Sequence, residues 1–244
     1  MNNRKYAFIT VCSGSLGKDI LQNILKKNYG VICHSRKTNK DLKQILNKNK
    51  KNIKKVLNFD LLDNQKIDKQ LKNLYKNIDH LDLVILNAAA PHGGTLEMTK
   101  INDIKKTFEI NFFSQIYIIQ KLLRLLKKST SPSIILISSI ASLSPSKGNM
   151  AYGGSKAAVN YATKVLAEEF ANYNIRVNSI APIVINNNMG KKMDTKSKNE
   201  MISSTFQKKI LKNKKIINII SFLISQKSKR INGQILRIDG GMKF

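Results

Sequence analysis

Cysteine is scarce in this chain, which has only two, Cys12 and Cys33, and tryptophan is missing altogether. The two cysteines do not form a CxxC pair, and so small a number excludes a framework stapled by disulfides. They fit a protein of a reducing compartment. The three histidines show no metal-ligand spacing, so we expect no metal site.

Long hydrophobic runs are also missing. No stretch of about 18 uninterrupted apolar residues occurs, which excludes a transmembrane helix. The first residues, from Met1 to Lys5, lead directly into a strand-like segment without the apolar core of a signal peptide or an amphipathic presequence. We therefore expect no membrane association and a cytoplasmic location.

Acidic residues are few, because 15 Asp and Glu stand against 43 Lys and Arg, for a formal net charge of +28. Such an excess is typical of proteins that bind nucleic acids. Here lysine carries almost all of it, and Asn and Ile, which share AT-rich codons with lysine, are also abundant. Nucleic-acid readers usually draw on arginine too, for bidentate contacts. We attribute the charge to base composition and expect no nucleic-acid partner, although a basic surface favours acidic partners.

The apolar residues that are present fall into short runs, rich in Ile and Val, that alternate with longer amphipathic stretches. Runs that are apolar on both faces are typical of parallel strands covered by helices on both sides. The alternation predicts a single-domain α/β Rossmann fold over residues 1–244, a doubly wound seven-stranded parallel sheet with helices on both faces. The predicted strands are Tyr6–Thr10, Val31–Ser35, Lys55–Phe59, Leu83–Asn87, Ser133–Ser138, Ile175–Ile180 and Gln234–Ile238; predicted helices include Leu16–Asn28, Asn64–Asn77, Ile101–Lys128 and Tyr152–Tyr173.

Segment Asn186–Lys215 has the least pattern and is polar and lysine-rich. It is either a mobile flap over a site or a solvated surface excursion. Ligands of such sheets bind beyond the carboxyl ends of the strands, so the residues just after each strand matter most.

The strongest chemical signal is Tyr152-Gly-Gly-Ser-Lys156, which begins thirteen residues after Ser139. Tyr152 and Lys156 are four residues apart and share one helix face. A nearby ammonium stabilises phenolate over phenol, so this tyrosine is a candidate proton donor near neutral pH. Ser139, at the end of a strand, is placed to hydrogen-bond a substrate oxygen.

These motifs, in this order and over essentially the whole chain, resemble the short-chain dehydrogenase/reductase family. Further matches are Asn111 in Phe-Glu-Ile-Asn-Phe, Asp60 after the third strand, Asn87-Ala88-Ala89 after the fourth and Asp239-Gly-Gly-Met near the end. The resemblance implies that Tyr152 exchanges the proton of the substrate oxygen and that Ser139 orients the carbonyl. It implies that Lys156 holds the nicotinamide ribose and lowers the pKa of Tyr152, while Asn111 supports a proton relay.

The resemblance also assigns a dinucleotide site. Cations in Ser35-Arg36-Lys37, where users of NAD tend to have an acidic residue, favour the 2′-phosphate of NADPH. The expected cofactor-binding residues are Thr10, Ser13, Gly14, Ser15, Leu16, Gly17, Arg36, Asp60, Asn87, Ala88, Tyr152, Lys156, Pro182, Val184, Ile185 and Asn187.

The phosphate loop, residues 10–17, departs from the family's TGxxxGxG pattern. Val11 and Ser15 replace the first two glycines, Gly17 remains, and Gly14 is an extra glycine one position early. Either Gly14 and the Ser13 and Ser15 hydroxyls rebuild an anion site, or cofactor binding is weakened or lost. Ile183 also replaces the glycine of a Pro-Gly pair and is expected to crowd the nicotinamide.

Within the family, the chain most resembles 3-oxoacyl-[acyl-carrier-protein] reductases, and Lys127 and Lys128 are candidate docking residues for the acidic carrier. Enoyl reductases usually space Tyr and Lys more widely than Tyr152 and Lys156. Two alternatives stay open: a reductase of another small ketone, and a non-catalytic family member with a degenerate cofactor loop. The resemblance further implies a homotetramer built partly from the helices Ile101–Lys128 and Tyr152–Tyr173.

Overall fold

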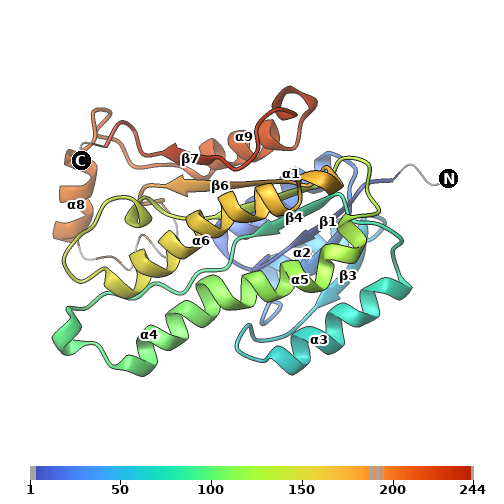
Figure 1. Ribbon diagram of the computed structural model, residues 1–244, viewed down its shortest axis with the longest axis horizontal. Helices are drawn as coiled ribbons and strands as arrows, with labels where there is room; N and C mark the ends of the chain where they lie inside the picture. The colour runs from blue at the N-terminus through green and yellow to red at the C-terminus, as the bar shows by residue number, and fades with distance from the viewer. Residues whose placement is uncertain (1–3, 187–189, 191–192, 194, 243–244) are drawn as a thin grey trace.

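The computed structural model describes residues 4–186, 190, 193 and 195–242. Seven strands form one parallel sheet in the order β3-β2-β1-β4-β5-β6-β7, which confirms the predicted fold class (Figure 1). The strands are β1 (Tyr6–Ile9), β2 (Gly30–His34), β3 (Ile53–Leu57), β4 (Leu83–Leu86), β5 (Ser133–Ile137), β6 (Arg176–Pro182) and β7 (Ile235–Ile238).

Helices cover both faces of the sheet. The α-helices are α1 (Ser15–Lys26), α2 (Lys40–Lys48), α3 (Asn64–Lys72), α4 (Ile101–Phe108), α5 (Ser114–Leu126), α6 (Met150–Glu169), α8 (Thr195–Ser203) and α9 (Asn213–Leu223). Short helical turns are η1 (Asn73–Lys76), η2 (Leu96–Met98), η3 (Glu109–Phe113), η4 (Ile140–Ser142), η5 (Ala171–Tyr173) and η6 (Gln226–Ser228). None of the described helices is long and apolar enough to span a bilayer.

The core is divided by the sheet into two apolar layers. One layer contains residues of α3, α5 and α6 and includes Phe8 and Val177. The other contains residues of α1, α2 and α9 and includes Ile9 and Ile135. Successive residues of a strand point to opposite faces, so a sheet buried on both sides needs the continuous apolar runs that the sequence contains.

The helix predicted over Ile101–Lys128 is interrupted. The α4 and α5 helices are separated by η3, a single π-helical turn that contains Asn111. A π-turn inserts an extra residue into the helix and often marks a functional position. The weakly patterned Asn186–Lys215 segment is more ordered than expected, because its described part includes α8 and pairs Ile185 with Leu211.

Candidate active site

Tyr152 and Ser139 meet at the carboxyl edge of the sheet. Ser139 follows β5 directly and caps η4, where its hydroxyl oxygen accepts a hydrogen bond from the Ala141 amide at 3.2 Å. Tyr152 lies in the first turn of α6. A hydrogen bond with Ser139 lowers the pKa of Tyr152, but burial outweighs it, and the net pKa of the phenol is raised. The structure thus brings the two hydroxyls together at the carboxyl edge.

Lys156 lies one turn further along α6 and is almost fully buried. Its amine donates to the carbonyl oxygens of Ile137 at 2.8 Å and Ala88 at 3.4 Å. Burial lowers the pKa of this amine to about 7. The predicted lowering of the Tyr152 pKa by Lys156 is not seen here, because the amine is directed to the two main-chain carbonyls. The side chain is nonetheless held at the site, at a pKa suited to proton exchange near neutral pH.

Asn111 connects three elements around this centre. Its side-chain oxygen accepts from the Ala90 amide at 2.6 Å, and its amide nitrogen donates to the Ala90 carbonyl at 3.1 Å and the Ser155 hydroxyl at 2.9 Å. The π-turn of η3 therefore anchors the loop after β4 to α6. Its expected part in a proton relay stays a prediction.

The phosphate loop holds the least expected backbone geometry. Val11 has φ = 55°, the left-handed region, which a β-branched residue rarely adopts. Its side chain packs against the apolar layer that contains Phe8. The loop therefore keeps the conformation for which a glycine is usually selected. The half-buried valine side chain also borders Gly14, because its Cγ1 atom is 3.5 Å from the place a Cβ on Gly14 would take.

The first turn of α1 is open to an anion. Gly14 is the N-cap, no side chain caps it, and the first turn holds no acidic residue. The φ of Gly14 is −74°, so this extra glycine is not required by backbone conformation. The Ser15 hydroxyl accepts a hydrogen bond from Asn213 of α9 at 3.1 Å, and Leu16 is buried in the core. Free amide groups at a helix N-terminus are a common phosphate site.

His34, the last residue of β2, lies beneath this loop. Its Nδ1 atom is 3.4 Å from the Val11 amide, and its Nε2 atom is 3.1 Å from the carbonyl oxygen of Phe59, on whose ring it stacks at 4.1 Å. A carbonyl only accepts, so Nε2 carries the proton and Nδ1 accepts from Val11. Burial lowers the pKa of His34 to about 4. The sequence feature that could have indicated a buried histidine is its position in a strand of otherwise small and apolar residues.

Residues at the ends of β2 and β3 face each other across the sheet edge. Arg36 lies 3.7 Å from Asp60, and both side chains are well exposed. The Ser35 and Ser13 hydroxyls are 2.8 Å apart, which ties the phosphate loop to the end of β2. The predicted cofactor residues Ser13, Arg36 and Asp60 are therefore brought to one edge.

The ends of β1 and β4 are joined in the same way. The Thr10 hydroxyl accepts from the Asn87 amide at 2.8 Å, and the Ala88 carbonyl accepts from Lys156. A Cβ atom built on Gly17 would lie 3.2 Å from the side-chain nitrogen of Asn87, so Gly17 and Asn87 are neighbours at this edge.

The loop after β6 lies beside the same edge. Pro182 pairs with Ile238 of β7, and Val184 and Ile185 are half-buried. Ile183 is buried and its amide donates to Ile238 at 3.0 Å, so its side chain belongs to the packed interior. Asn187 lies outside the described residues.

The described residues fit a dinucleotide. The uncapped first turn of α1 offers amides to a diphosphate. At the carboxyl edge, Thr10 bonds to the main chain of Asn87, and Lys156 bonds to the next residue, Ala88.

Comparison with known proteins identifies the family. A family model described as Enoyl-(Acyl carrier protein) reductase, a short-chain dehydrogenase/reductase model, matches residues 12–243. The chain belongs to the short-chain dehydrogenase/reductase family. It is 28% identical over 241 residues to the 3-oxoacyl-[acyl-carrier-protein] reductase FabG of Buchnera aphidicola subsp. Acyrthosiphon pisum, with 98% of each chain covered. It is 30% identical over 183 residues to the enzyme of the same name from Chlamydia trachomatis, covering 75% of this chain and 74% of that one.

A solved structure of ElxO with NADP bound is similar throughout. Its TM-score is 0.86 at 27% sequence identity, with 97% of this chain and 98% of that chain covered. The similarity therefore extends over the whole fold and is not confined to the motif around Tyr152.

The expected docking residues lie away from the candidate active site within this subunit, and their role stays a prediction. Lys127 and Lys128 follow the last turn of α5, and this end of the helix leads into the start of β5. They lie at the amino edge of the sheet, whereas Ser139 and Tyr152 lie at the carboxyl edge. Lys127 instead stacks over the ring of Tyr173 at 3.6 Å. Helices that return between parallel strands must end opposite the carboxyl edge, which the lysine count alone did not reveal.

Proposed function

We propose that this protein reduces a ketone to a secondary alcohol with NADPH, and that its substrate is a 3-oxoacyl chain carried on acyl carrier protein. The observation that carries the proposal is the hydrogen-bonded pair of Ser139 and Tyr152, with the buried Lys156 amine one helical turn away. This set offers a carbonyl oxygen a hydrogen-bond donor and a proton.

In this mechanism the substrate carbonyl oxygen lies between the two hydroxyls. Ser139 donates a hydrogen bond that orients and polarises the carbonyl, and Tyr152 delivers its proton to the oxygen as negative charge develops there. Bound NADPH supplies the hydride to the carbonyl carbon. Lys156, with its pKa near 7, is suited to pass a proton back toward the resulting phenolate.

Asn111 has a supporting role in the proposal. It fixes Ala90 and Ser155 and so holds the loop after β4 against α6. Because Lys156 also bonds to Ala88 in that loop, the position of the amine depends on the same clamp. We propose that this connection aligns the proton relay.

The cofactor is proposed to lie along the row from α1 to Lys156. The amides of the first α1 turn, with Ser13 and Gly14, would hold the diphosphate. Asp60 would contact the adenine, and Arg36, with Lys37 beside it, would hold a 2′-phosphate. The exposed Arg36 shares only a 3.7 Å contact with Asp60 and remains accessible for that phosphate. NADPH is therefore favoured over NADH.

The substrate class follows from two considerations. The curated relatives in Buchnera and Chlamydia are named 3-oxoacyl-[acyl-carrier-protein] reductases. The matching family model is described as an enoyl reductase, but the four-residue spacing of Tyr152 and Lys156 favours a ketone substrate.

An acidic carrier would meet basic residues at the carboxyl edge. Lys147 is exposed in the loop before α6, next to Gly148, whose carbonyl accepts from the Gly94 amide at 2.8 Å. Lys100 is exposed at the N-cap of α4. We propose these two lysines as docking residues beside the expected pair Lys127 and Lys128.

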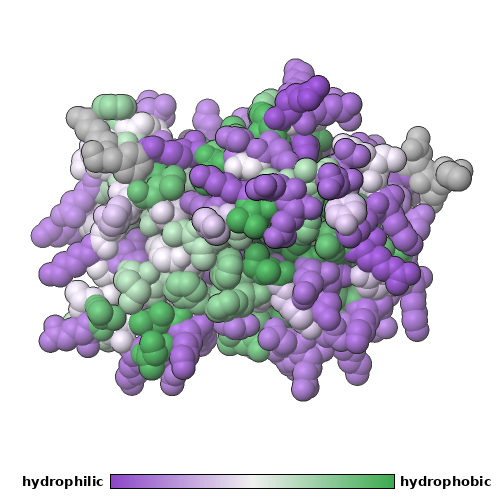
Figure 2. Space-filling model, viewed as in Figure 1, coloured by the Kyte–Doolittle hydropathy of each residue, from purple (hydrophilic) through white to green (hydrophobic). Residues whose placement is uncertain are grey.

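A homotetramer is proposed from the outer faces of α5 and α6. A groove of about 730 Å³ runs there between Phe113, Tyr117 and Phe170. Figure 2 shows apolar side chains gathered on this face. Phe113 and Tyr161 are 53% and 74% exposed, which is unusual for large aromatic residues on an isolated subunit.

We propose that the protein works in the cytoplasm, in keeping with its two unpaired cysteines.

The test measures NADPH oxidation with an acetoacetyl thioester and with simple ketones. We expect turnover of the thioester, at least a thousandfold loss in Tyr152→Phe, and unchanged NADPH affinity in that variant. Activity on simple ketones alone would favour a reductase of another small molecule.

Titration of the protein with NADPH, followed by nicotinamide fluorescence, tests the alternative of a non-catalytic member. Absence of binding at millimolar cofactor would overturn the proposed function. For the docking surface, Lys147→Glu is expected to raise KM for the carrier-linked substrate. An equal rise in Lys127→Glu would favour docking at the opposite edge.

A further inference from the structure

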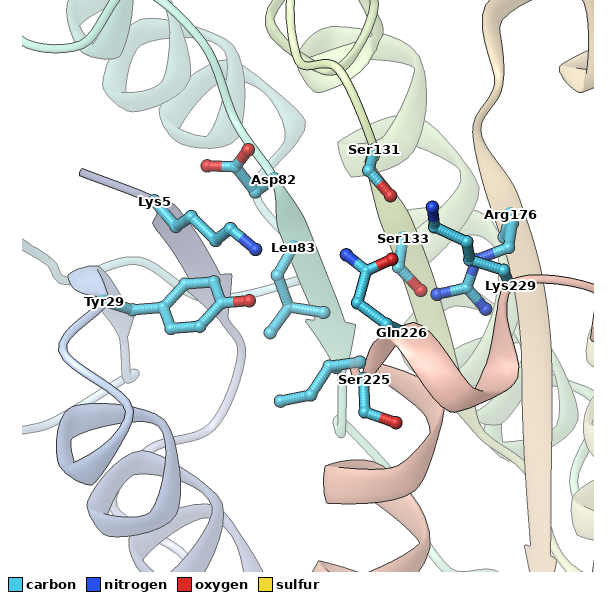
Figure 3. Close-up of a pocket in the computed structure, with 11 residues that line it drawn as sticks. Lys5, Tyr29, Asp82, Leu83, Ser131, Ser133, Arg176, Ser225, Gln226 and Lys229 are labelled. Atoms are coloured by element: carbon cyan, nitrogen blue, oxygen red, sulfur yellow. The ribbon is translucent and has the colours of Figure 1, made fainter. Parts of the chain in front are cut away.

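A small polar cavity lies at the amino edge of the sheet, opposite the candidate active site. It is bordered by the starts of β4, β5 and β6, by the segments before β1 and β2, and by the end of α9 with η6. Figure 3 shows side chains from these separate segments directed toward one space. The residues that line it include Lys5, Asp82, Ser133, Arg176, Gln226 and Lys229.

The floor of the cavity is set by the register of the sheet. Ser133 of β5 pairs with Leu83 of β4 and with Arg176 of β6, so the three side chains stand side by side on one face. Two residues further along β5, Ile135 occupies the same face and belongs to the apolar layer. Ser133 therefore marks the point where that apolar layer gives way to polar groups.

The hydroxyl of Ser133 is the group in this cavity that most needs a ligand. Ser133 is 2% exposed, and its Oγ atom has no hydrogen-bond partner among the described residues. A buried hydroxyl without a partner is unfavourable, and such groups usually bond to a bound water or ion. Because Ser133 lines the cavity, a small ligand in that space would satisfy it.

The charges around the cavity select the kind of ligand. Lys5, Arg176 and Lys229 contribute three cations, and Gln226 contributes an amide. Arg176 donates to carbonyl oxygens, including Leu223 at 2.7 Å, so these bonds do not neutralise its charge.

The carboxylate that lines the cavity, Asp82, is already engaged. It accepts from the Tyr6 amide at 2.7 Å and from the Ser129 hydroxyl at 2.6 Å, and it lies 3.2 Å from the ring of His80. Asp82 keeps its negative charge, but the three cations outnumber it around the space.

We propose that this cavity is a binding site for a single halide-sized anion, chloride under ordinary conditions. Its volume is about 20 Å³, which is room for one water-sized particle and too little for phosphate or a carboxylate. Ser133 donates to the anion from the floor, and Arg176 and Lys229 provide the compensating charge. The anion would connect β5 and β6 to the end of α9 and stabilise the amino edge.

Bromide tests the site directly, because it replaces chloride and scatters anomalously. Crystals grown in bromide are expected to show an anomalous peak within hydrogen-bond reach of the Ser133 hydroxyl. An ordered water at that position, with no anomalous signal, would overturn the proposal.

Thermal unfolding provides the second test, without the need for crystals. At constant ionic strength, replacing gluconate by chloride is expected to raise the Tm along a saturable curve, by about 3–6 °C at ten times the Kd. In Ser133→Ala and Lys229→Gln this rise should be lost. Lys227→Gln, which makes the same change of charge on η6 outside the cavity, should keep it. An equal rise in all variants would indicate general salt stabilisation and contradict the site.

Discussion

The main chain at Val11 lies so close to Gly17 that a methyl group on Gly17 would overlap the Val11 carbonyl group. Val11 is held in the left-handed region by its place between β1 and α1, and Gly17 is the residue that leaves room for its carbonyl. The first helix can therefore pack against a loop that lacks two of the usual glycines, because the third glycine is at the point of closest approach.

Val11→Gly is expected to relieve backbone strain. A left-handed L-residue costs about 1–2 kcal/mol, whereas glycine adopts this region freely. Because the substitution also removes an apolar side chain, Val11→Ala is the matched comparison. We expect Val11→Gly to exceed Val11→Ala in unfolding free energy by about 1 kcal/mol, measured by urea titration, and to bind NADPH several-fold more tightly than wild type. Equal stabilities for the two variants would argue against strain at this position.

Gly17→Ala tests the close approach itself. The added methyl group must displace the Val11 carbonyl, which should destabilise the protein by about 1–3 kcal/mol and weaken NADPH binding at least tenfold. Gly93→Ala is the control, because a Cβ atom there meets nothing within 4 Å. Urea unfolding and fluorescence titration of both variants measure the two effects. If Gly17→Ala behaves like the control, the loop is not constrained as described.

His34 makes the stability of the fold depend on pH. Its folded pKa, about 4, lies below the ordinary value of 6.5 because the ring is buried. The unfolded chain therefore binds a proton first, and this stability, present above pH 6.5, is lost as the pH falls toward 4. His34→Gln should flatten the decline relative to wild type by up to about 3 kcal/mol. Parallel curves for the two proteins would contradict the burial of a neutral ring.

Lys156→Met is expected to exchange activity for stability. Burial lowers the pKa of this amine from 10.5 to about 7, so the unfolded chain binds the proton more tightly between these values. The cost is full below pH 7 and fades as the pH rises to 10.5. The variant should be more stable than wild type at pH 7 by on the order of 2 kcal/mol, less so at pH 9.5, and inactive. A variant that is less stable at both pH values would show that the hydrogen bonds of Lys156 outweigh its burial.

Much of the architecture could be predicted because it depends on the order of apolar and polar residues that are close in the sequence. The runs of Ile and Val gave the seven strands to within one or two residues, and the spacing from Ser139 to Tyr152 and Lys156 gave the group of side chains at the carboxyl edge. The π-turn at Asn111 could not be predicted, because the amphipathic pattern continues through it. The edge of the sheet at which Lys127 and Lys128 lie could not be predicted from charge composition, because composition does not say where in the fold a residue lies.

The sequence by itself determined the doubly wound order of elements and the chemical identity of the proposed catalytic groups, because period and motif are properties of neighbouring residues. Only the tertiary structure decided the conformation of Val11, the buried contact of His34 with the phosphate loop and the isolated hydroxyl of Ser133. Each depends on groups brought together from distant parts of the chain, and the free energy of burial acts on those groups only after the sheet has assembled.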